Sequence, residues 1–156
     1  MLNKSLKILL FLSILILQQG CGYQTLLTEK YQKFSVKSFN IEGNKKLGQA
    51  LSNYFNEIDN AENNLIFNIK GEKQKEISNR SSAGTPLEYK ITLDFNLKVI
   101  SYPDNNEVFD QNFSQSGSFK ASKLHIDSIN QEKKIVDNIV KNIAGQVTNR
   151  LNLIYK

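Results

Sequence analysis

Residues 87–99 read LEYKITLDFNLKV, in which apolar and polar side chains alternate at every position. Successive side chains of a β-strand point to opposite faces of its sheet, so this pattern predicts a strand with one buried and one wet side. Such a strand is typical of an antiparallel sheet that is covered on one face only. The expected wet side carries Glu88, Lys90, Thr92, Asp94, Asn96 and Lys98.

The segments before this strand predict a strand, a helix and a second strand. Residues 34–41 predict a strand whose apolar phase changes between Val36 and Phe39, which indicates a bulge. Gly43-Asn44 predicts a turn. A helix of about four turns is expected next, because apolar residues recur at helical spacing: Leu47, Leu51, Tyr54, Phe55 and Ile58. A second strand follows, with alternation at Leu65, Phe67 and Ile69 and a polar end that leads into a turn at 81–86.

The segments after it predict a turn at 103–106, a fourth strand over 109–119 that weakens at Gly117, and a long terminal helix. Asp127 or Ser128 can cap this helix, and its apolar stripe is Ile129, Val136, Ile139, Val140, Ile143, Val147, Leu151 and Ile154. The order β-α-β-β-β-α predicts an α+β two-layer sandwich over residues 34–156. Its four-stranded mixed sheet begins with a parallel pair, and both helices cover one face.

The first 20 residues predict an export signal. Residues 1–7 carry two lysines and no acid, and residues 8–17 are an apolar stretch that is too short to anchor the chain across a membrane. A buried N-terminal helix or strand is the alternative. It is disfavoured because the stretch is apolar all round and has no amphipathic face.

Cys21, the single cysteine of the chain, comes directly after Gly20, and only Gln18-Gln19-Gly20 separate it from the apolar stretch. An exported chain with one cysteine has no internal disulfide partner, so the alternatives are a free thiol and lipid attachment. The segment Leu17 to Cys21 resembles the bacterial lipoprotein processing box, although Gln18 stands where that box usually has leucine. The resemblance implies a diacylglycerol and an acyl chain on Cys21, which would hold the protein on a membrane. Residues 21–33 would then be a lipidated lead, and Gly22, where inner-membrane retention favours aspartate, points to the outer membrane.

Charge and composition disfavour nucleic-acid binding, catalysis and metal binding. The net charge of +5 at pH 7 falls when residues 1–20 are removed, leaving 18 basic and 15 acidic residues, which is a mild excess. His125 is the single histidine, and the carboxylates Asp104, Glu107 and Asp110 fall on an expected turn without an apolar pocket. Phosphate-loop, HExxH and GxSxG motifs are absent from the sequence. We therefore expect a protein that is not an enzyme and holds neither a metal nor a cofactor beyond the lipid.

Two groups of basic residues are candidates for an anion site. Lys73, Lys75 and Arg80 lie near the turn between the second and third strands, and Lys120 and Lys123 lie between the last strand and the last helix. Ordinary surface charge is one interpretation. Recognition of lipid phosphate is the other, because cations bind phosphate by charge and arginine can bind it with two donors.

Several short motifs together resemble the LptE family of lipopolysaccharide-assembly lipoproteins. They are Cys21-Gly22-Tyr23-Gln24 at the expected mature terminus, Leu87-Glu88-Tyr89-Lys90-Ile91 after a polar turn, and Ala144-Gly145-Gln146 with Asn149-Arg150-Leu151 in the terminal helix. The likeness spans nearly all of the mature chain and rests on element order and these motifs.

The resemblance implies a lipid-anchored outer-membrane protein that plugs the LptD β-barrel, assists its assembly and binds lipopolysaccharide. The wet side of the third strand would suit a barrel lumen, which is polar. Arg80, Lys120 and Lys123 are the expected lipopolysaccharide contacts, chosen by location. Two alternatives remain: a periplasm-facing outer-membrane adaptor that does not bind lipopolysaccharide and, less favoured with one histidine, a secreted hydrolase fragment.

Overall fold

The computed structural model describes residues 32–155 except residue 60. The predicted signal peptide, Cys21 and residues 21–31 of the predicted lead lie outside the described residues. The described elements are β1 (Ser35–Gly43), α2 (Lys45–Ser52), β2 (Asn64–Arg80), β3 (Pro86–Tyr102), β4 (Glu107–Lys120) and α3 (His125–Ile154). Within these residues, no helix combines the length and apolar character that a membrane span requires.

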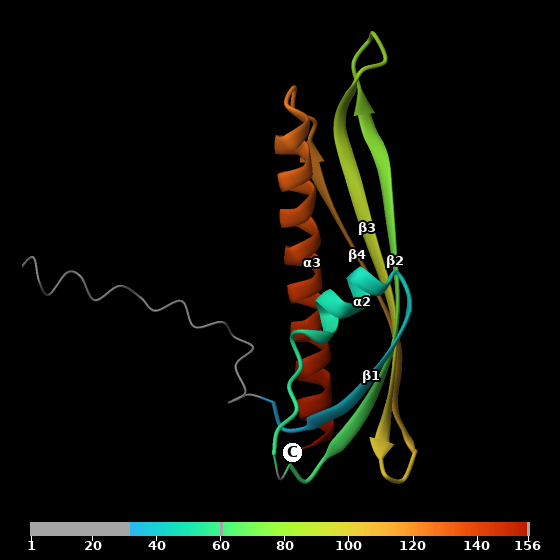
Figure 1. The fold of residues 1–156 in the computed structure, drawn as a ribbon. Coiled ribbons are helices and arrows are strands. Elements are labelled where there is room, and N and C mark those ends of the chain that lie inside the picture. The colour runs from blue at the N-terminus through green and yellow to red at the C-terminus, as the bar shows by residue number, and fades with distance from the viewer. Residues whose placement is uncertain (1–31, 60, 156) are drawn as a thin grey trace, which may run out of the picture.

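The four strands form one mixed sheet in the order β1-β2-β3-β4. β1 runs parallel to β2, whereas β2, β3 and β4 form an antiparallel meander. The register of β1 shifts between Val36 and Ser38, which confirms the predicted bulge. Figure 1 shows both helices on the same side of this long sheet, with α3 running along most of its length. The predicted two-layer α+β sandwich is confirmed.

The core lies between the sheet and the helices. On β3 the predicted buried side is confirmed from Ile91 to Val99, where every second residue is at most 1 % exposed. The prediction fails at the start of the strand, because Leu87 is 47 % exposed. Leu87 lies at the start of β3, beside the β2–β3 turn. Figure 1 shows that this hairpin extends beyond the first turn of α3, which leaves its tip without a helix over it.

The turn before α2 depends on two residues that the sequence singles out. Gly43 has a φ of +69°, and a Cβ there would lie 2.6 Å from the Gly71 carbonyl oxygen, so glycine is required. Asn44 caps α2, because its side-chain oxygen accepts a hydrogen bond from the Leu47 N–H at 3.2 Å. The predicted turn is confirmed.

Helix α2 is shorter than predicted, with 8 residues that end at Ser52. Tight backbone hydrogen bonds at Tyr54 and Phe55 replace further helical turns. They place Phe55 in the core, with its ring centroid 4.9 Å from that of Phe67. The apolar spacing past residue 52 therefore reflects core packing of a turn rather than a continuing helix.

The start of α3 also differs from the prediction, because neither Asp127 nor Ser128 is its N-cap. The helix begins at His125, and both side chains bind the preceding connection from within the first turns. The Ser122 N–H donates to Ser128 Oγ at 3.1 Å, and Ser122 Oγ donates to Asp127 Oδ2 at 3.1 Å. The two ends of the predicted apolar stripe are exposed, Ile129 by 46 % and Ile154 by 50 %, because both lie near the ends of the sheet.

The predicted weakening of the fourth strand at Gly117 is wrong. The strand continues regularly to Lys120. Gly117 lies directly under α3, and a Cβ there would lie 2.9 Å from Ile135 Cγ2. The glycine therefore marks close packing of strand and helix rather than a break in the strand.

Candidate functional site

The sheet face that the helices leave open carries polar side chains along β3. The six residues of β3 that the alternation places on it are all half-buried and point away from the helices: Glu88, Lys90, Thr92, Asp94, Asn96 and Lys98. The neighbouring strands continue this surface through Lys70 and Glu72 of β2 and through Asn112 and Ser114 of β4. We call it the uncovered face.

Amide side chains connect the strands across the uncovered face. Asn96 Nδ2 donates to Asn112 Oδ1 at 2.9 Å and to Asp110 Oδ1 at 3.3 Å. Asn40 Nδ2 donates to Asn68 Oδ1 at 2.8 Å, which joins β1 to β2. The polar groups on this face are thus already oriented, so a partner would meet a fixed pattern of donors and acceptors.

The charges on the uncovered face are mostly paired. Lys98 Nζ lies 2.7 Å from Glu107 Oε2, and Lys90 Nζ lies 3.5 Å from Glu76 Oε1. The hydrogen bond and charge of Glu107 raise the pKa of Lys98 above its ordinary value. The face is therefore polar and of mixed sign, rather than a strongly basic or acidic surface.

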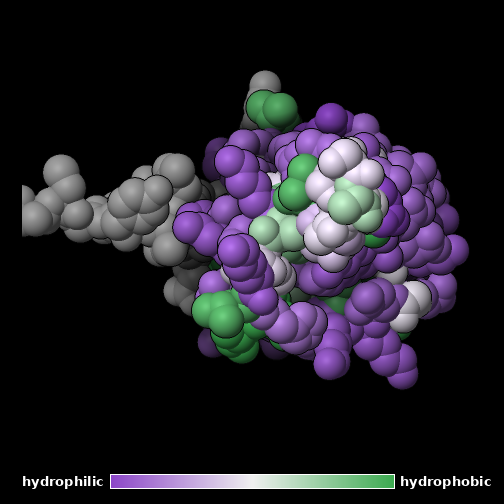
Figure 2. All heavy atoms as spheres, turned by 90° about the horizontal axis from the view of Figure 1, so that it is seen from above, coloured by the Kyte–Doolittle hydropathy of each residue, from purple (hydrophilic) through white to green (hydrophobic). Residues whose placement is uncertain are grey.

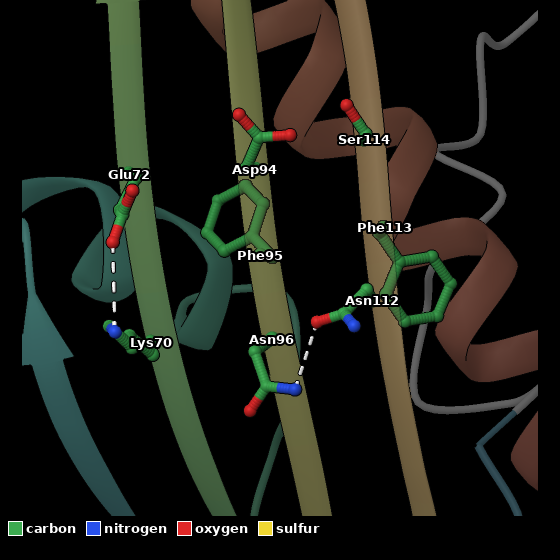
Figure 3. A pocket seen from close by; sticks show the side chains of 8 residues that line it. All are labelled: Lys70, Glu72, Asp94, Phe95, Asn96, Asn112, Phe113 and Ser114. Carbon is green, nitrogen blue, oxygen red and sulfur yellow. Dashed lines mark hydrogen bonds and ion pairs between the residues drawn. The ribbon is translucent and has the colours of Figure 1, made fainter.

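A shallow hollow of about 260 Å³ lies in the middle of the uncovered face. Figure 3 shows its polar rim on three neighbouring strands, with Lys70 and Glu72 on β2, Asp94 and Asn96 on β3, and Asn112 on β4. Within the described residues, no group of three or more histidine, cysteine or acidic side chains could hold a metal ion. The hollow offers hydrogen-bond donors and acceptors to a surface that lies over it.

The predicted lipopolysaccharide contacts lie together at one end of the sandwich. This hairpin end comprises the β2–β3 turn (81–85), the β4–α3 connection (121–124) and the first turns of α3. Arg80 is in register with Pro86 at the turn, and its Nη1 donates to the Gly84 carbonyl at 2.9 Å. Lys120 and Lys123 are exposed at the end of β4 and in the connection. Lys120 and Lys123 are thus more available to an anion than Arg80, which already binds its own turn.

Lys73 and Lys75 lie elsewhere than their sequence position suggests. Their side chains are on the helix side of β2, where both bind the carboxylate of Glu132 on α3. Burial by itself would raise the pKa of Glu132, but the hydrogen bonds and charges of the two lysines hold it below its ordinary value. Lys75 Nζ also lies 4.6 Å from the centroid of the Tyr89 ring. We call these three charged residues the Glu132 clasp; it joins β2 to α3 and leaves neither lysine free for lipid.

The sequence interpretation missed a group of exposed apolar residues at the hairpin end. Leu124 is 63 % exposed and Ile126 is 59 % exposed, on either side of the exposed His125. Leu87 and Ile129 belong to the same end, and Figure 2, which views the molecule from it, shows apolar atoms at the surface among polar ones. The position of Leu124 and Ile126 before the apolar stripe of α3 is the signal that could have revealed them.

Comparisons with known proteins establish the fold. No family model matches the chain, and no curated protein matches it. Among solved structures, lipoprotein B from Nitrosomonas europaea is 16 % identical over 76 % of this chain and 85 % of its own, with a TM-score of 0.55. Rare lipoprotein B from Shewanella oneidensis is 11 % identical over 74 % of this chain and 98 % of its own, with a TM-score of 0.50. A minor lipoprotein from Acinetobacter baumannii is 13 % identical over 74 % of this chain and 88 % of its own, also with a TM-score of 0.50. At such identities the likeness extends to the fold, and this chain shares its architecture with proteins described as lipoproteins.

Proposed function

We propose that this protein is an outer-membrane lipoprotein that plugs an LptD-like β-barrel, helps it to assemble and binds lipopolysaccharide. The observation that carries the proposal is the uncovered face, an ordered and polar sheet surface on a domain whose other sheet face is packed in the core from Ile91 to Val99 of β3. The likeness in fold to solved lipoproteins supports it, as does the LptE-like sequence of motifs.

A barrel lumen suits the uncovered face for physical reasons. The inside of an outer-membrane barrel is polar and hydrated, so a plug needs an outer surface that keeps polar groups hydrogen-bonded without apolar contact. Asn96 is already hydrogen-bonded to Asn112 before any partner arrives. Lys90 and Lys98 are likewise already paired with acidic side chains. Because these groups already have partners, little free energy of desolvation is lost when the face approaches a similarly polar wall.

The lipid anchor rests on Cys21, which follows the predicted signal peptide. Acylation there would keep the domain at the membrane, since two or more acyl chains give stable anchoring. Mass spectrometry of protein extracted from membranes should show a chain that begins at Cys21 and carries three acyl chains. A chain that begins at Met1, or an unmodified Cys21, would remove the lipoprotein assignment.

The hairpin end is the surface that would meet lipopolysaccharide. Lys120 and Lys123 can bind phosphate, and the exposed Leu124 and Ile126 can contact acyl chains beside them. Lipopolysaccharide combines these two chemistries in one molecule.

Co-purification tests the barrel partner. We expect the tagged full-length protein to recover a large β-barrel protein from detergent-solubilised outer membranes. Lys90→Glu combined with Lys98→Glu should reduce that recovery, because the reversals place like charges against Glu76 and Glu107 and against the partner. Lys133→Glu combined with Lys134→Glu, on the exposed side of α3, is the control with the same charge change. Recovery of other envelope proteins without a barrel would instead indicate the adaptor function.

A further inference from the structure

Among the described residues, three stretches of strand edge have no strand neighbour: the outer side of β1, β2 beyond Gly71, and β4. The last two differ in how well they resist pairing with another strand. β1 ends opposite Gly71, so β2 has no neighbour on that side from Glu72 to Arg80. β4 is the last strand of the sheet, so within the part of the chain that the structure describes its outer side has no strand neighbour. Open edges expose unpaired peptide groups and invite another strand unless charges or bulges prevent it.

The open edge of β2 is protected in this way. Four of its first five residues are charged: Glu72, Lys73, Lys75 and Glu76. Register shifts follow at Ile77 and Asn79, which disturb the ladder further along. This edge has the features by which proteins avoid strand addition.

The open edge of β4 lacks these features. Its pairing with β3 is regular from Phe109 to Lys120. The nine residues 111–119 (QNFSQSGSF) contain neither a charge nor a proline. The N–H of Ala121 donates to the Leu87 carbonyl, so odd-numbered residues of β4 direct their peptide groups to β3 and even-numbered residues direct theirs to the open edge.

The two ends of this uncharged segment are complementary in charge. Asp110 precedes it and Lys120 follows it, at equal distances from Gln115. Two copies of β4 placed antiparallel about a two-fold axis at Gln115 would set Asp110 of each copy opposite Lys120 of the other. The same register sets Ser114 opposite Ser116, which gives small hydroxyl pairs next to the axis. A slip of two residues would leave both charges without a partner.

Helix α3 offers a matching surface above this edge. Ile135 packs over Gly117 of β4, and residues at helical spacing from it continue along the same flank. They are exposed and uncharged amides: Asn138, Asn142, Gln146 and Asn149. Arg150 ends this flank, where its Nη1 donates to Gln111 of β4 and its guanidinium lies over the Phe113 ring. The part of the flank between Ile135 and Arg150 that a second copy would bring next to its own equivalent thus presents these amides.

We propose that β4 pairs with β4 of a second copy of this chain about a two-fold axis at Gln115, which joins the two four-stranded sheets into one. The complementarity of Asp110 and Lys120 favours a second copy as the partner. A single two-fold axis places Asp110 of each copy opposite Lys120 of the other and so forms two ion pairs. The dimer does not depend on the proposed barrel or lipid, and its tests use the purified chain alone.

Analytical ultracentrifugation can measure the dissociation constant of the dimer. The full chain carries Cys21→Ala, so that it has no acyl anchor and no thiol. We expect Ser116→Pro to weaken association at least roughly tenfold, because it removes an N–H that faces the open edge and not β3. Ser116→Ala is the matched control, and circular dichroism checks that both variants fold. A parent chain that is monomeric at all concentrations, or a proline variant as dimeric as the alanine one, would overturn the proposal.

Charge exchange tests the register. Asp110→Lys and Lys120→Asp should each weaken the dimer, and the double variant should restore it, because the opposed pair is then re-formed with its sign reversed. Failure of the double variant to recover association would show that these residues are not opposed.

A cysteine at the axis gives a second, independent test. Gln115→Cys should form a disulfide between two copies, since Cα atoms of a non-hydrogen-bonded antiparallel pair lie about 4.5 Å apart. Ser118→Cys, which is exposed but far from its own equivalent in this register, should not. Equal cross-linking of both variants, or cross-linking of Gln115→Cys in membranes to a different protein only, would exclude the second copy as the occupant.

Discussion

The two faces of β3 differ sharply although their residues alternate along a single strand. Phe95 is 1 % exposed and packs in the core, whereas its neighbour Asn96 lies on the uncovered face and bridges to Asn112 of β4. The helix-covered face is dry and apolar, while the uncovered face is made of hydrogen-bonded amides, hydroxyls and paired charges. The difference assigns the core to the helix-covered face, and the uncovered face is the surface through which we propose that the protein associates.

The largest expected effect comes from the covered face. Phe95→Ala should lower the free energy of unfolding by about 3–5 kcal/mol, since it removes a buried aromatic ring and leaves a cavity. Thr92→Ala, on the uncovered face of the same strand, should change it by no more than about 0.5 kcal/mol. Chemical denaturation of both variants checks the pair. Equal destabilisation would show that the sheet is not one-sided.

A smaller effect is expected at the Glu132 clasp, which joins the polar end of β2 to α3. Glu132→Gln should cost about 1 kcal/mol, because hydrogen bonds from charged lysines are stronger than neutral ones but are partly screened here. Lys133→Gln is a control on the exposed side of the same helix and should be nearly neutral. Thermal denaturation at pH 7 compares the two.

The clasp also predicts a pH dependence. The pKa of Glu132 is lowered in the folded protein, so its contribution is present above the unfolded pKa of about 4.3 and is lost as the pH falls through the folded value. The difference in melting temperature between the parent and Glu132→Gln should therefore shrink below about pH 4. A difference that stays constant from pH 7 to pH 3 would show that the charge of Glu132 does not contribute.

The smallest effect on stability is expected at the hairpin end. Lys120→Glu combined with Lys123→Glu changes two exposed residues outside the core, so the melting temperature should hardly move. Binding of purified lipopolysaccharide should weaken, and more at low salt, where phosphate contacts are less screened. Unchanged lipid binding at low salt would remove these lysines from the proposed mechanism.

The sequence was informative where periodicity determines structure. The alternation from Ile91 to Val99 predicted one buried side, and the change of phase after Val36 predicted a bulge, because both patterns depend on local side-chain direction. The parallel start of the sheet followed from the single helix between the first two strands. The fold class could thus be predicted before any contact was known.

Features that depend on tertiary contacts could not be predicted. The early end of α2 depends on how Phe55 meets Phe67 in the core. The partners of Lys73 and Lys75 depend on Glu132, which lies more than 50 residues away in the sequence. Their charge suggested a lipid site, and only the packing of α3 on β2 shows that both are already bound.

Site-specific photo-cross-linking in cells tests most directly whether the uncovered face is the association surface. A photoreactive residue in place of Thr92, at the centre of that face, should cross-link to a large outer-membrane β-barrel protein. The same residue in place of Lys134, on the exposed side of α3, should give less of this product. A barrel cross-link from position 92 that exceeds the one from position 134 is the result that the proposed plug predicts. No barrel product from position 92, in cells where the parent protein is fully membrane-bound, would contradict it.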